Sequence, residues 1–323
     1  MNPNNTTLSP RRSRHATFGL RRMAFAGLLT LQLIAGEETQ AAVAGYGYGY
    51  NFGQNATAKG LYEVDYSTGV ASFLTSLTPT FASANGLAYF NGLGSNGSIV
   101  YGNDTDARLA VVNRSNLSQV VAGDLNAFTA GAFTGAVRNG TSHNGSFYTI
   151  AQGTDDLWKI DFNSGTFLLT TAAKVADVWN NTKSYNFGDI AISGSGILYA
   201  TGTNTSTNNT EFFSYNVTAL NSPATLGTGS YNGLGFGTNG LLYGSLDSTG
   251  HSWNEINTAT GNVNSVIGTG LTYTLADLTQ AASTSAIPEP SSLVLLLVAG
   301  LSVSTRQRRL SGCLLYTSPS PRD

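Results

Sequence analysis

A short strand pattern that ends in aspartate or asparagine recurs five times along the chain and constrains its fold more than any other feature. Each copy alternates apolar and polar residues, as a short β-strand does, and the final Asp or Asn favours a turn. The five copies end at Asp65, Asn113, Asp161, Asn216 and Asn257, with spacings of 48, 48, 55 and 41 residues. Four residues after three of these positions stand Gly69, Gly165 and Gly261, and glycine accepts the positive φ that such a turn needs.

Three further strand-like segments accompany the copies. A segment that ends in tyrosine precedes four of them, and three of these segments follow an Asn-Gly pair, the strongest hairpin signal in a sequence. One strand earlier lie segments rich in small residues, at 86–89, 135–137, 189–192, 233–236 and 276–278. A fourth strand follows most of the turns, for example at Thr166–Thr170. The unit is therefore four strands in about 45 residues, which is typical of a β-propeller blade.

The two ends of the repeat predict how the ring closes. Four complete sets begin near residues 84, 133, 187 and 231, which leaves three strands at the N-terminal end and one at the C-terminal end. The three are Tyr46–Phe52, Leu61–Asp65 and Val70–Leu74, and the one is Leu275–Thr279. Together they make a fifth blade from both ends, which removes the open sheet edges. We predict an all-β protein, a β-propeller of about five four-stranded blades, or six if Thr171–Tyr185 hides another. A β-sandwich or solenoid gives similar strands, but the in-phase copies favour the propeller.

The N-terminal 44 residues have the features of a secretory signal peptide. Five arginines precede the apolar run Met23–Ala35, and small residues follow at 41–44. A buried first helix is the alternative, and translation starting at Met23 is a further option. We expect a signal helix in 1–44 and an ectodomain over 45–282.

The C-terminal region has three parts in a fixed order. Pro288, Glu289 and Pro290 lie in a linker at 283–292, an apolar run follows, and Arg306, Arg308 and Arg309 close the segment 293–309. This order resembles the PEP-CTERM sorting signal, with Gln307 interrupting the basic cluster. The arginines would hold the end of a hydrophobic helix at the cytoplasmic face. The resemblance implies export, a transient stay in the inner membrane, cleavage by an exosortase-type enzyme, and release to the outer surface or extracellular matrix of an exopolysaccharide-producing bacterium.

Residues 310–323 are expected to lie outside the natural protein. Residues 313–323 resemble the translated adapter used in sequencing-library preparation, and they contain the only cysteine, Cys313. Without it, no disulfide, cysteine-based metal site or thiol nucleophile is expected in the ectodomain.

The ectodomain is acidic, although the whole chain is almost neutral. Residues 45–286 contain seven Lys or Arg and fourteen Asp or Glu, which gives a formal charge of about −7. Nucleic acid is therefore not an expected partner, since phosphate binding needs clustered basic side chains.

A few polar residues are candidates for binding, and none forms a recognisable catalytic set. Asn85, Asp189, Asn232 and Asp277 begin or lie on the predicted channel strands, where converging carboxylates bind an ion or a sugar. Asp104 and Asp106 are weak Ca²⁺ candidates, as is the pair Asp155-Asp156, because alternating oxygen ligands suit Ca²⁺. His143 and His251 are expected in turns, and Trp158, Trp179, Trp253, Tyr185 and Tyr231 either stack on sugars or, more simply, fill the core between blades.

These features together predict an exported, non-enzymatic protein with a structural or binding role in the exopolysaccharide matrix. Its expected partners are the export machinery, the exosortase-type enzyme and the polysaccharide, and no cofactor is expected. The first alternative is a carbohydrate-active enzyme that uses Asp189 and Asp277, since some five-bladed propellers are glycosidases. The second is a scaffold stabilised by Ca²⁺.

Overall fold

The computed structural model describes residues 44–50, 60–77, 84–90, 97–103, 105–245, 253–267 and 274–279. All of them belong to one compact unit, Val43–Asp323. The predicted signal peptide up to residue 43, the Pro-Glu-Pro linker, the hydrophobic segment and the C-terminal tail lie outside the described residues. Within the described part, no helix is long and apolar enough to cross a membrane.

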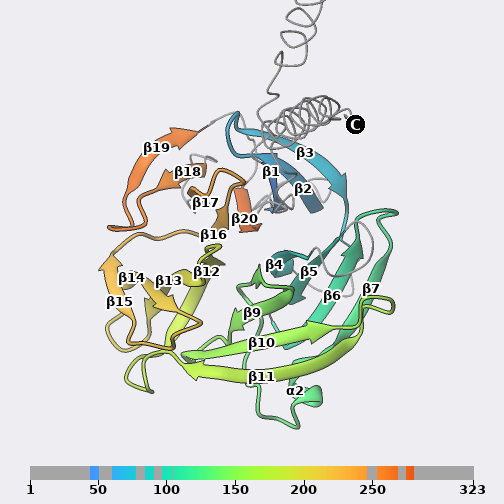
Figure 1. Cartoon of the computed structure of the whole chain (residues 1–323), viewed down its shortest axis with the longest axis horizontal. Helices are drawn as coiled ribbons and strands as arrows, with labels where there is room; N and C mark the ends of the chain where they lie inside the picture. The colour runs from blue at the N-terminus through green and yellow to red at the C-terminus, as the bar shows by residue number, and fades with distance from the viewer. Residues whose placement is uncertain are drawn as a thin grey trace, which may run out of the picture. The chain divides into compact units, whose positions relative to one another are not determined.

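The described strands form five antiparallel four-stranded sheets arranged around a common axis, so the fold is a β-propeller (Figure 1). We number the sheets as blades 1 to 5 and give their strands from the axis outward. Blade 1 contains β20 (Thr274–Thr279), β1 (Ala44–Tyr50), β2 (Gly60–Asp65) and β3 (Val70–Thr75). Blade 2 contains β4 (Ala84–Phe90), β5 (Ser98–Asn103), β6 (Arg108–Asn113) and β7 (Gln119–Asp124). Blade 3 contains β8 (Thr141–His143), β9 (Ser146–Ile150), β10 (Asp156–Phe162) and β11 (Leu169–Asp177). Blade 4 contains β12 (Tyr185–Ile192), β13 (Ile197–Asn204), β14 (Thr210–Asn216) and β15 (Ala224–Gly227). Blade 5 contains β16 (Gly233–Phe236), β17 (Leu242–Ser245), β18 (Trp253–Ile256) and β19 (Val263–Ile267).

The predicted closure of the ring is confirmed. β20, from the C-terminal end of the repeat, pairs antiparallel with β1, from its N-terminal end, with Tyr46 opposite Thr279 and Gly47 opposite Leu278. The axis strands then contact one another in ring order, β20 to β4 to β8 to β12 to β16 and back to β20. The region Thr171–Tyr185 does not hide another blade, because β11 and the loop after it occupy it, and the described strands make five blades.

The hydrophobic core lies in the gaps between blades. The described residues form five apolar clusters, one for each pair of neighbouring blades. Each blade is a sheet with a neighbour on both faces, so both sets of alternating side chains are buried near the axis. Strand β2 shows this, because Leu61 packs towards blade 2 while Tyr62 and Val64 pack towards blade 5. The predicted role of the aromatics is thus confirmed for Trp158, Trp253, Tyr185 and Tyr231, which are at most 4% exposed.

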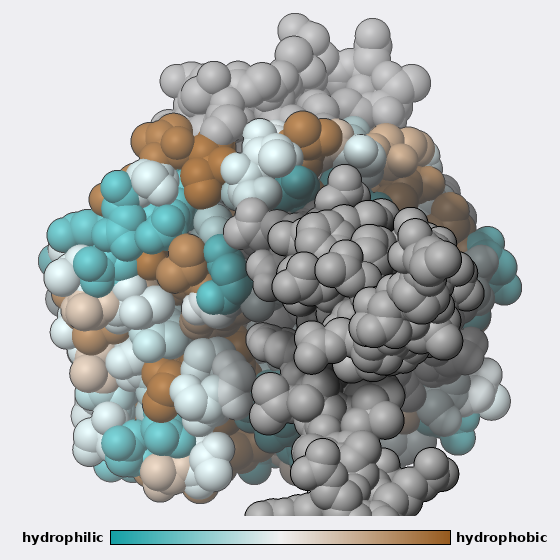
Figure 2. Space-filling view, turned by 45° about the horizontal axis from the view of Figure 1, so that its top comes forward, coloured by the Kyte–Doolittle hydropathy of each residue, from teal (hydrophilic) through white to brown (hydrophobic). Residues whose placement is uncertain are grey.

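The outermost strands have a neighbour on one edge only and are more exposed. β3 and β19 present Val70, Phe73, Val263 and Val266 to solvent. Figure 2 shows apolar groups of this kind scattered among hydrophilic ones over the uncovered part of one face. Single exposed apolar residues are normal on soluble proteins.

An Asp or Asn starts the same turn in every blade, between the third and fourth strands, and in four of the five blades it is the recurring residue. Its side-chain Oδ1 accepts a hydrogen bond from the N–H two residues on, and its carbonyl accepts one from the N–H four residues on. The residue at the fourth position has a φ between 50° and 77° in all five turns, although it is glycine only at Gly69 and Gly261. The others are Leu117, Phe167 and Leu220, so the Asp/Asn turn imposes the left-handed conformation even on bulky residues.

Blade 3 departs from the prediction in two places. Its turn starts at Asn163 and not at Asp161, because β10 continues to Phe162 and the Asn163 side chain accepts the N–H groups of Gly165 and Thr166. Asp161 instead accepts hydrogen bonds from the hydroxyls of Ser146 and Thr171. Gly165 therefore does not take the left-handed position, which falls to Phe167.

The axis strand of blade 3 also lies later than predicted. Residues 135–137 are not a strand, and the axis strand is β8, Thr141–His143. Gly135 adopts φ 95°, and a side chain there would meet the carbonyl of Gln152. Between this segment and β8, the Asn139 side chain replaces backbone pairing, because its amide donates to the Ile150 carbonyl and accepts from the Ile150 N–H, both at 2.8 Å. An amide side chain can imitate a peptide group in this way.

Candidate functional site

Two of the four predicted channel residues meet at the axis. Asp189 of β12 and Asp277 of β20 are 0% and 1% exposed, and burial, followed by the charge and hydrogen bond of Asp277, raises the pKa of Asp189 well above its ordinary value. Asn85 pairs through its backbone with Gly102, and its side chain lies outside the described part of the structure. Asn232 is half-buried immediately before β16, and no hydrogen bond among those of the described residues joins it to either aspartate. A ligand-binding role for these four residues stays a prediction.

The alternative of glycoside hydrolysis by Asp189 and Asp277 depends on the separation of their carboxyl groups. The two carboxyl groups of a glycosidase lie about 5–10 Å apart, with the sugar or a water between them. Asp189 and Asp277 instead contact each other, and Asp189 also accepts the backbone N–H groups of Leu234 at 2.6 Å and Ile190 at 2.7 Å. These contacts engage the carboxyl group with protein groups inside the ring.

The other predicted residues lie apart from the axis. Asp106 forms an ion pair with Arg108 at 2.6 Å, so a cation already neutralises the weak Ca²⁺ candidate. Asp104, His251 and the sorting-signal residues lie outside the described residues. His143 is at the turn between β8 and β9, where it pairs with the Asn144 amide at 3.0 Å, and burial lowers its pKa.

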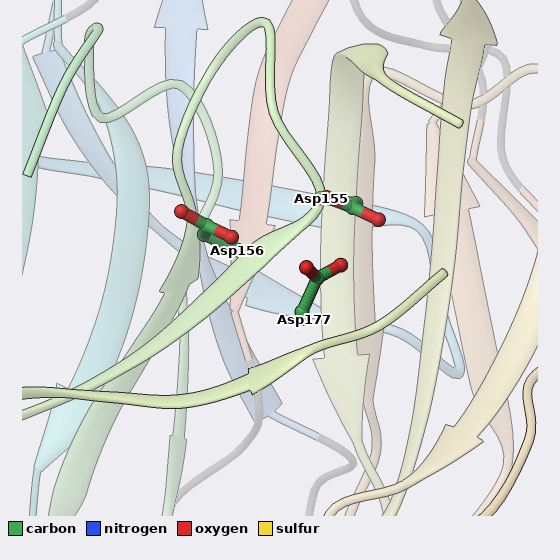
Figure 3. Close-up of side chains that lie close together, drawn as sticks. All are labelled: Asp155, Asp156 and Asp177. Atoms are coloured by element: carbon green, nitrogen blue, oxygen red, sulfur yellow. The ribbon is translucent and has the colours of Figure 1, made fainter. Parts of the chain in front are cut away.

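A cluster of three aspartates lies at the end of blade 3 where β10 begins (Figure 3). Asp155 and Asp156 are consecutive, and β11 brings Asp177 opposite Asp156. The ligand oxygens of the three lie within 4.8 Å of one another, and the carboxylate of Asp177 points towards Asp155 in Figure 3. The sequence suggested Asp155 and Asp156, but Asp177 was not foreseen because only strand pairing places it beside them.

Protein groups already balance much of the charge in this cluster. Asp155 is 3% exposed and accepts the N–H groups of Trp179 at 3.0 Å and Asn181 at 3.2 Å. Burial, and then the hydrogen bond and charge of Asp177, raise the pKa of Asp155 to about 6. Lys174 forms an ion pair with Asp156 at 2.5 Å. The cluster has the oxygen donors that Ca²⁺ prefers, but a cation would have to compete with Lys174 and with these amides.

Two adjoining hollows extend from this cluster onto blade 4, and we call them together the Lys183 groove. The smaller hollow is about 240 Å³ and includes Asp155 and Asp156. The larger is about 480 Å³, and Lys183 lines both. Apart from glycines, every lining residue has a polar side chain: Thr154, Asp155, Asp156, Asn181, Thr182, Lys183, Ser184, Ser206, Asn209, Thr210, Glu211, Thr225 and Thr228.

Glu211 of β14 organises the floor of the Lys183 groove. Its carboxylate accepts hydrogen bonds from Lys183 at 2.6 Å, the Tyr185 hydroxyl at 2.8 Å and the Asn204 amide at 3.1 Å. Burial alone would raise the pKa of Glu211, but these three hydrogen bonds lower it below the ordinary value, so the carboxylate stays ionised. The Lys183 ammonium also lies 4.0 Å from the ring centre of Trp179, which is half-buried. A cation held over an indole and against a carboxylate is fixed in position before any ligand arrives.

Sequence reasoning named Trp179 and Tyr185 as aromatics but missed Lys183 and Glu211. They are 28 residues apart, in a loop and in a strand of blade 4, and no local pattern links them. The only available signal was their rarity, because the ectodomain contains few charged residues.

Comparison with known proteins leaves the function open. No family model matches the chain, and no match was found among curated proteins. Similar solved structures include a chain of a nidogen/laminin complex, with 13% identity, a TM-score of 0.45, and coverage of 68% of this chain and 76% of that chain. TolB from Acinetobacter baumannii has 10% identity and a TM-score of 0.44, with coverage of 72% and 54%. The Dos1 propeller has 12% identity and a TM-score of 0.38, with coverage of 72% and 59%.

The similar structures include both enzymes and binding proteins. An aldose sugar dehydrogenase from Streptomyces coelicolor and an auxiliary nutrient binding protein from Bacteroides thetaiotaomicron both have a TM-score of 0.39. The chain spans less than two thirds of the length of TolB, of the Dos1 propeller and of both these proteins. At identities of 10–13% and TM-scores below 0.5, these likenesses carry no statement about what this chain does.

Proposed function

We propose that this protein is exported and binds neutral glycan chains of an exopolysaccharide matrix at the cell surface, without catalysing a reaction. The observation that carries the binding part is the Lys183 groove. Its walls offer hydroxyl, amide and carboxylate groups, and no large apolar side chain is among the residues that line it. Such a surface suits a ligand that presents many hydroxyl groups and little apolar area.

The charge of the Lys183 groove favours a neutral ligand over an anionic one. Lys183 is paired with Glu211, Lys174 is paired with Asp156, and the neighbouring carboxylates leave the groove without excess positive charge. A polyanionic chain would need unpaired cations. The larger hollow, at about 480 Å³, falls within the size range of small-molecule sites.

The location and processing parts of the proposal depend on the sequence. The arginine-rich start followed by an apolar run supports export, and Pro288, Glu289 and Pro290 before an apolar run and three arginines support removal of the tail by an exosortase-type enzyme. The protein would then reach the outer surface or the matrix after a transient stay in the inner membrane.

Binding is tested by retention of the full chain on exopolysaccharide immobilised from the producing strain. We expect the wild type to be retained and Lys183→Ala to lose at least tenfold in apparent affinity, because the variant removes the fixed cation and leaves Glu211 without its charged partner. Arg108→Ala is the matched control, since it removes an ion pair of the same 2.6 Å length outside the groove, and it should bind like the wild type. No retention of the wild type, or equal binding by Lys183→Ala, would refute the binding role.

Processing is tested separately. A substitution of Glu289 by alanine in the producing strain should leave the C-terminal segment attached and the protein in the membrane fraction. Mass spectrometry of the secreted protein reports the cleavage. A processed and secreted Glu289→Ala protein would contradict the sorting role, whatever the outcome of the binding test.

A further inference from the structure

One buried side chain at the axis contacts four of the five blades. Asp189 belongs to β12 of blade 4, and its Oδ2 accepts the N–H of Leu234, in β16 of blade 5, at 2.6 Å. Its Oδ1 accepts the N–H of Ile190 at 2.7 Å and, more distantly at 3.4 Å, that of Gly140, immediately before β8 of blade 3. The fourth contact is the carboxyl group of Asp277, in β20 of blade 1. Asp189 therefore joins the middle of the chain to the strand that closes the ring.

The contact between Asp189 and Asp277 requires a proton. Both residues are at most 1% exposed, and two carboxylates in contact without water repel each other strongly. A shared proton turns this repulsion into a hydrogen bond, as it does whenever two such carboxyl groups occupy one site.

The strands around the pair contain no lysine or arginine that could balance a second negative charge, and the basic residue nearest in sequence to a contact of Asp189 is the partly buried Arg138, two residues before Gly140. The axis strands β4, β8, β12, β16 and β20 contain neither residue, and nor does β1. Their other titratable side chains are Tyr46, Tyr48, Tyr50, Tyr89, His143 and Tyr185. Of these, Tyr46 bonds to Arg114, Tyr185 bonds to Glu211, and His143 packs against Tyr148.

Two tyrosines from outside the axis strands also lie near the pair. Tyr66 is fully buried, and burial, followed by the charges of Asp189, Asp277 and Tyr243, raises its pKa well above the ordinary value. Tyr243 stacks on Tyr66 with ring centres 4.6 Å apart. A phenol carries no positive charge in either protonation state, so neither tyrosine offsets a second carboxylate charge.

We propose that Asp189 and Asp277 hold one proton between them, and that this proton fastens the closing strand to blade 4, so that the ring loosens as the medium becomes alkaline. Three backbone N–H groups donate to Asp189, which stabilises negative charge on its oxygens and makes them good acceptors for the proton shared with Asp277.

The direction of the pH effect follows from proton linkage. Burial, and then the charge and hydrogen bond of Asp277, raise the pKa of Asp189 in the pair well above the ordinary aspartate value. The folded protein thus binds more protons than the unfolded chain above about pH 4. The shared proton stabilises the fold fully below the pKa of aspartate in the unfolded chain. This stabilisation is lost as pH rises through the pKa of the pair in the folded protein. The unfolding equilibrium constant rises by up to about tenfold per pH unit in that window.

The two aspartates predict different responses to the same substitution. Asp277→Asn supplies an amide that donates to Asp189 at any pH, so the full chain should stay folded and lose this pH dependence in urea unfolding between pH 5 and pH 9. Asp189→Asn places an amide donor against backbone N–H donors, so its unfolding constant at pH 7 should exceed that of Asp277→Asn by tenfold or more. Asp65→Asn is the control, because Asn occupies the same turn position at Asn113, Asn216 and Asn257.

A spectroscopic measurement gives an independent test. Infrared spectra of the wild type at pH 7 should contain the band of a protonated carboxylic acid, and that band should diminish in Asp277→Asn and not in Asp65→Asn. The proposal is wrong if Asp277→Asn keeps the wild-type pH dependence, if it is the less stable of the two variants, or if the band is absent from the wild type.

Discussion

The hydroxyl group of Tyr66 joins the two ends of the repeat and is the most direct test of how the ring is closed. Tyr66 is fully buried, and its hydroxyl donates to the carbonyl of Thr279 at 2.8 Å, across 213 residues of sequence. Its ring stacks on Tyr243 and meets Trp253 edge-on. Tyr66→Phe keeps the ring contacts and removes only the hydrogen bond between the turn after β2 and the end of β20.

The expected cost of Tyr66→Phe is about 1 kcal/mol, the net worth of one intramolecular hydrogen bond. This corresponds to roughly a fivefold increase in the equilibrium constant for opening the closure. Because Tyr66 contacts the end of β20, the increase should appear in the amide hydrogen exchange of β20 and of its partner β1. Mass spectrometry of the exchanged protein measures both strands, and urea unfolding gives the global free energy.

Tyr231→Phe is a matched control for this measurement. The Tyr231 hydroxyl also donates to a backbone carbonyl at 2.8 Å, that of Gly261, but the two residues are only 30 apart and lie away from the closure. We expect a similar global cost without faster exchange in β1 and β20. Unchanged exchange in these strands for Tyr66→Phe, or an equal increase for Tyr231→Phe, would show that the Tyr66 hydroxyl does not secure the ring.

Three further predictions follow from the same contacts. Gly235→Ala places a Cβ 2.5 Å from the Tyr66 hydroxyl and 2.7 Å from the Thr279 carbonyl, so it should lower the free energy of unfolding in urea by about 1–3 kcal/mol. In the control Gly194→Ala the Cβ would meet nothing within 4 Å, so its free energy of unfolding should stay within about 0.5 kcal/mol of the wild type. Equal effects of the two variants would contradict this reasoning. Because the pKa of Asp155 is raised to about 6, the contribution of this carboxyl group to the free energy of unfolding should decline as pH rises from about 4 through 6. The urea midpoint should therefore fall less over that range in Asp155→Asn than in the wild type. Identical midpoint curves for the two proteins would argue against this role of Asp155. Removal of divalent cations with a chelator should leave the thermal midpoint unchanged, because Lys174 and backbone amides already balance the charge of the aspartate cluster. A thermal midpoint that depends on Ca²⁺ in the wild type but not in Asp177→Asn would instead support the Ca²⁺-stabilised scaffold.

Much of the fold is predictable from the sequence because the blade is a local unit. A strand, a turn and the next strand lie within about 45 residues, and the Asp or Asn that starts each turn acts on amides two and four residues away. Such short-range hydrogen bonds require particular residue types at fixed spacings, and these can be recognised in the sequence. The prediction of five blades, with one blade built from both ends of the repeat, was therefore correct. The errors occurred where a long-range effect changed the local pattern. In blade 3, hydroxyls of the neighbouring strands bond to Asp161 and the turn starts at Asn163, and the side chain of Asn139 pairs with Ile150 ahead of the later axis strand.

The candidate sites divide in the same way. The sequence placed Asp189 and Asp277 on axis strands, since the small residues beside them mark the crowded centre of a propeller. It predicted that carboxylates converge at the axis, but not which of the four candidates would pair, because blade 5 separates the blades of Asp189 and Asp277 along the ring.

The chain by itself determined the repeating unit, the closure of the ring and the acidic, cysteine-free character of the ectodomain, since these depend on residue type and spacing. The tertiary structure alone decided which charged groups meet: Lys183 with Glu211, Asp155 with Asp177, and Asp189 with Asp277. The physical reason is that electrostatic and hydrogen-bond energies depend on distance and burial, and both are fixed only when separate blades pack against one another.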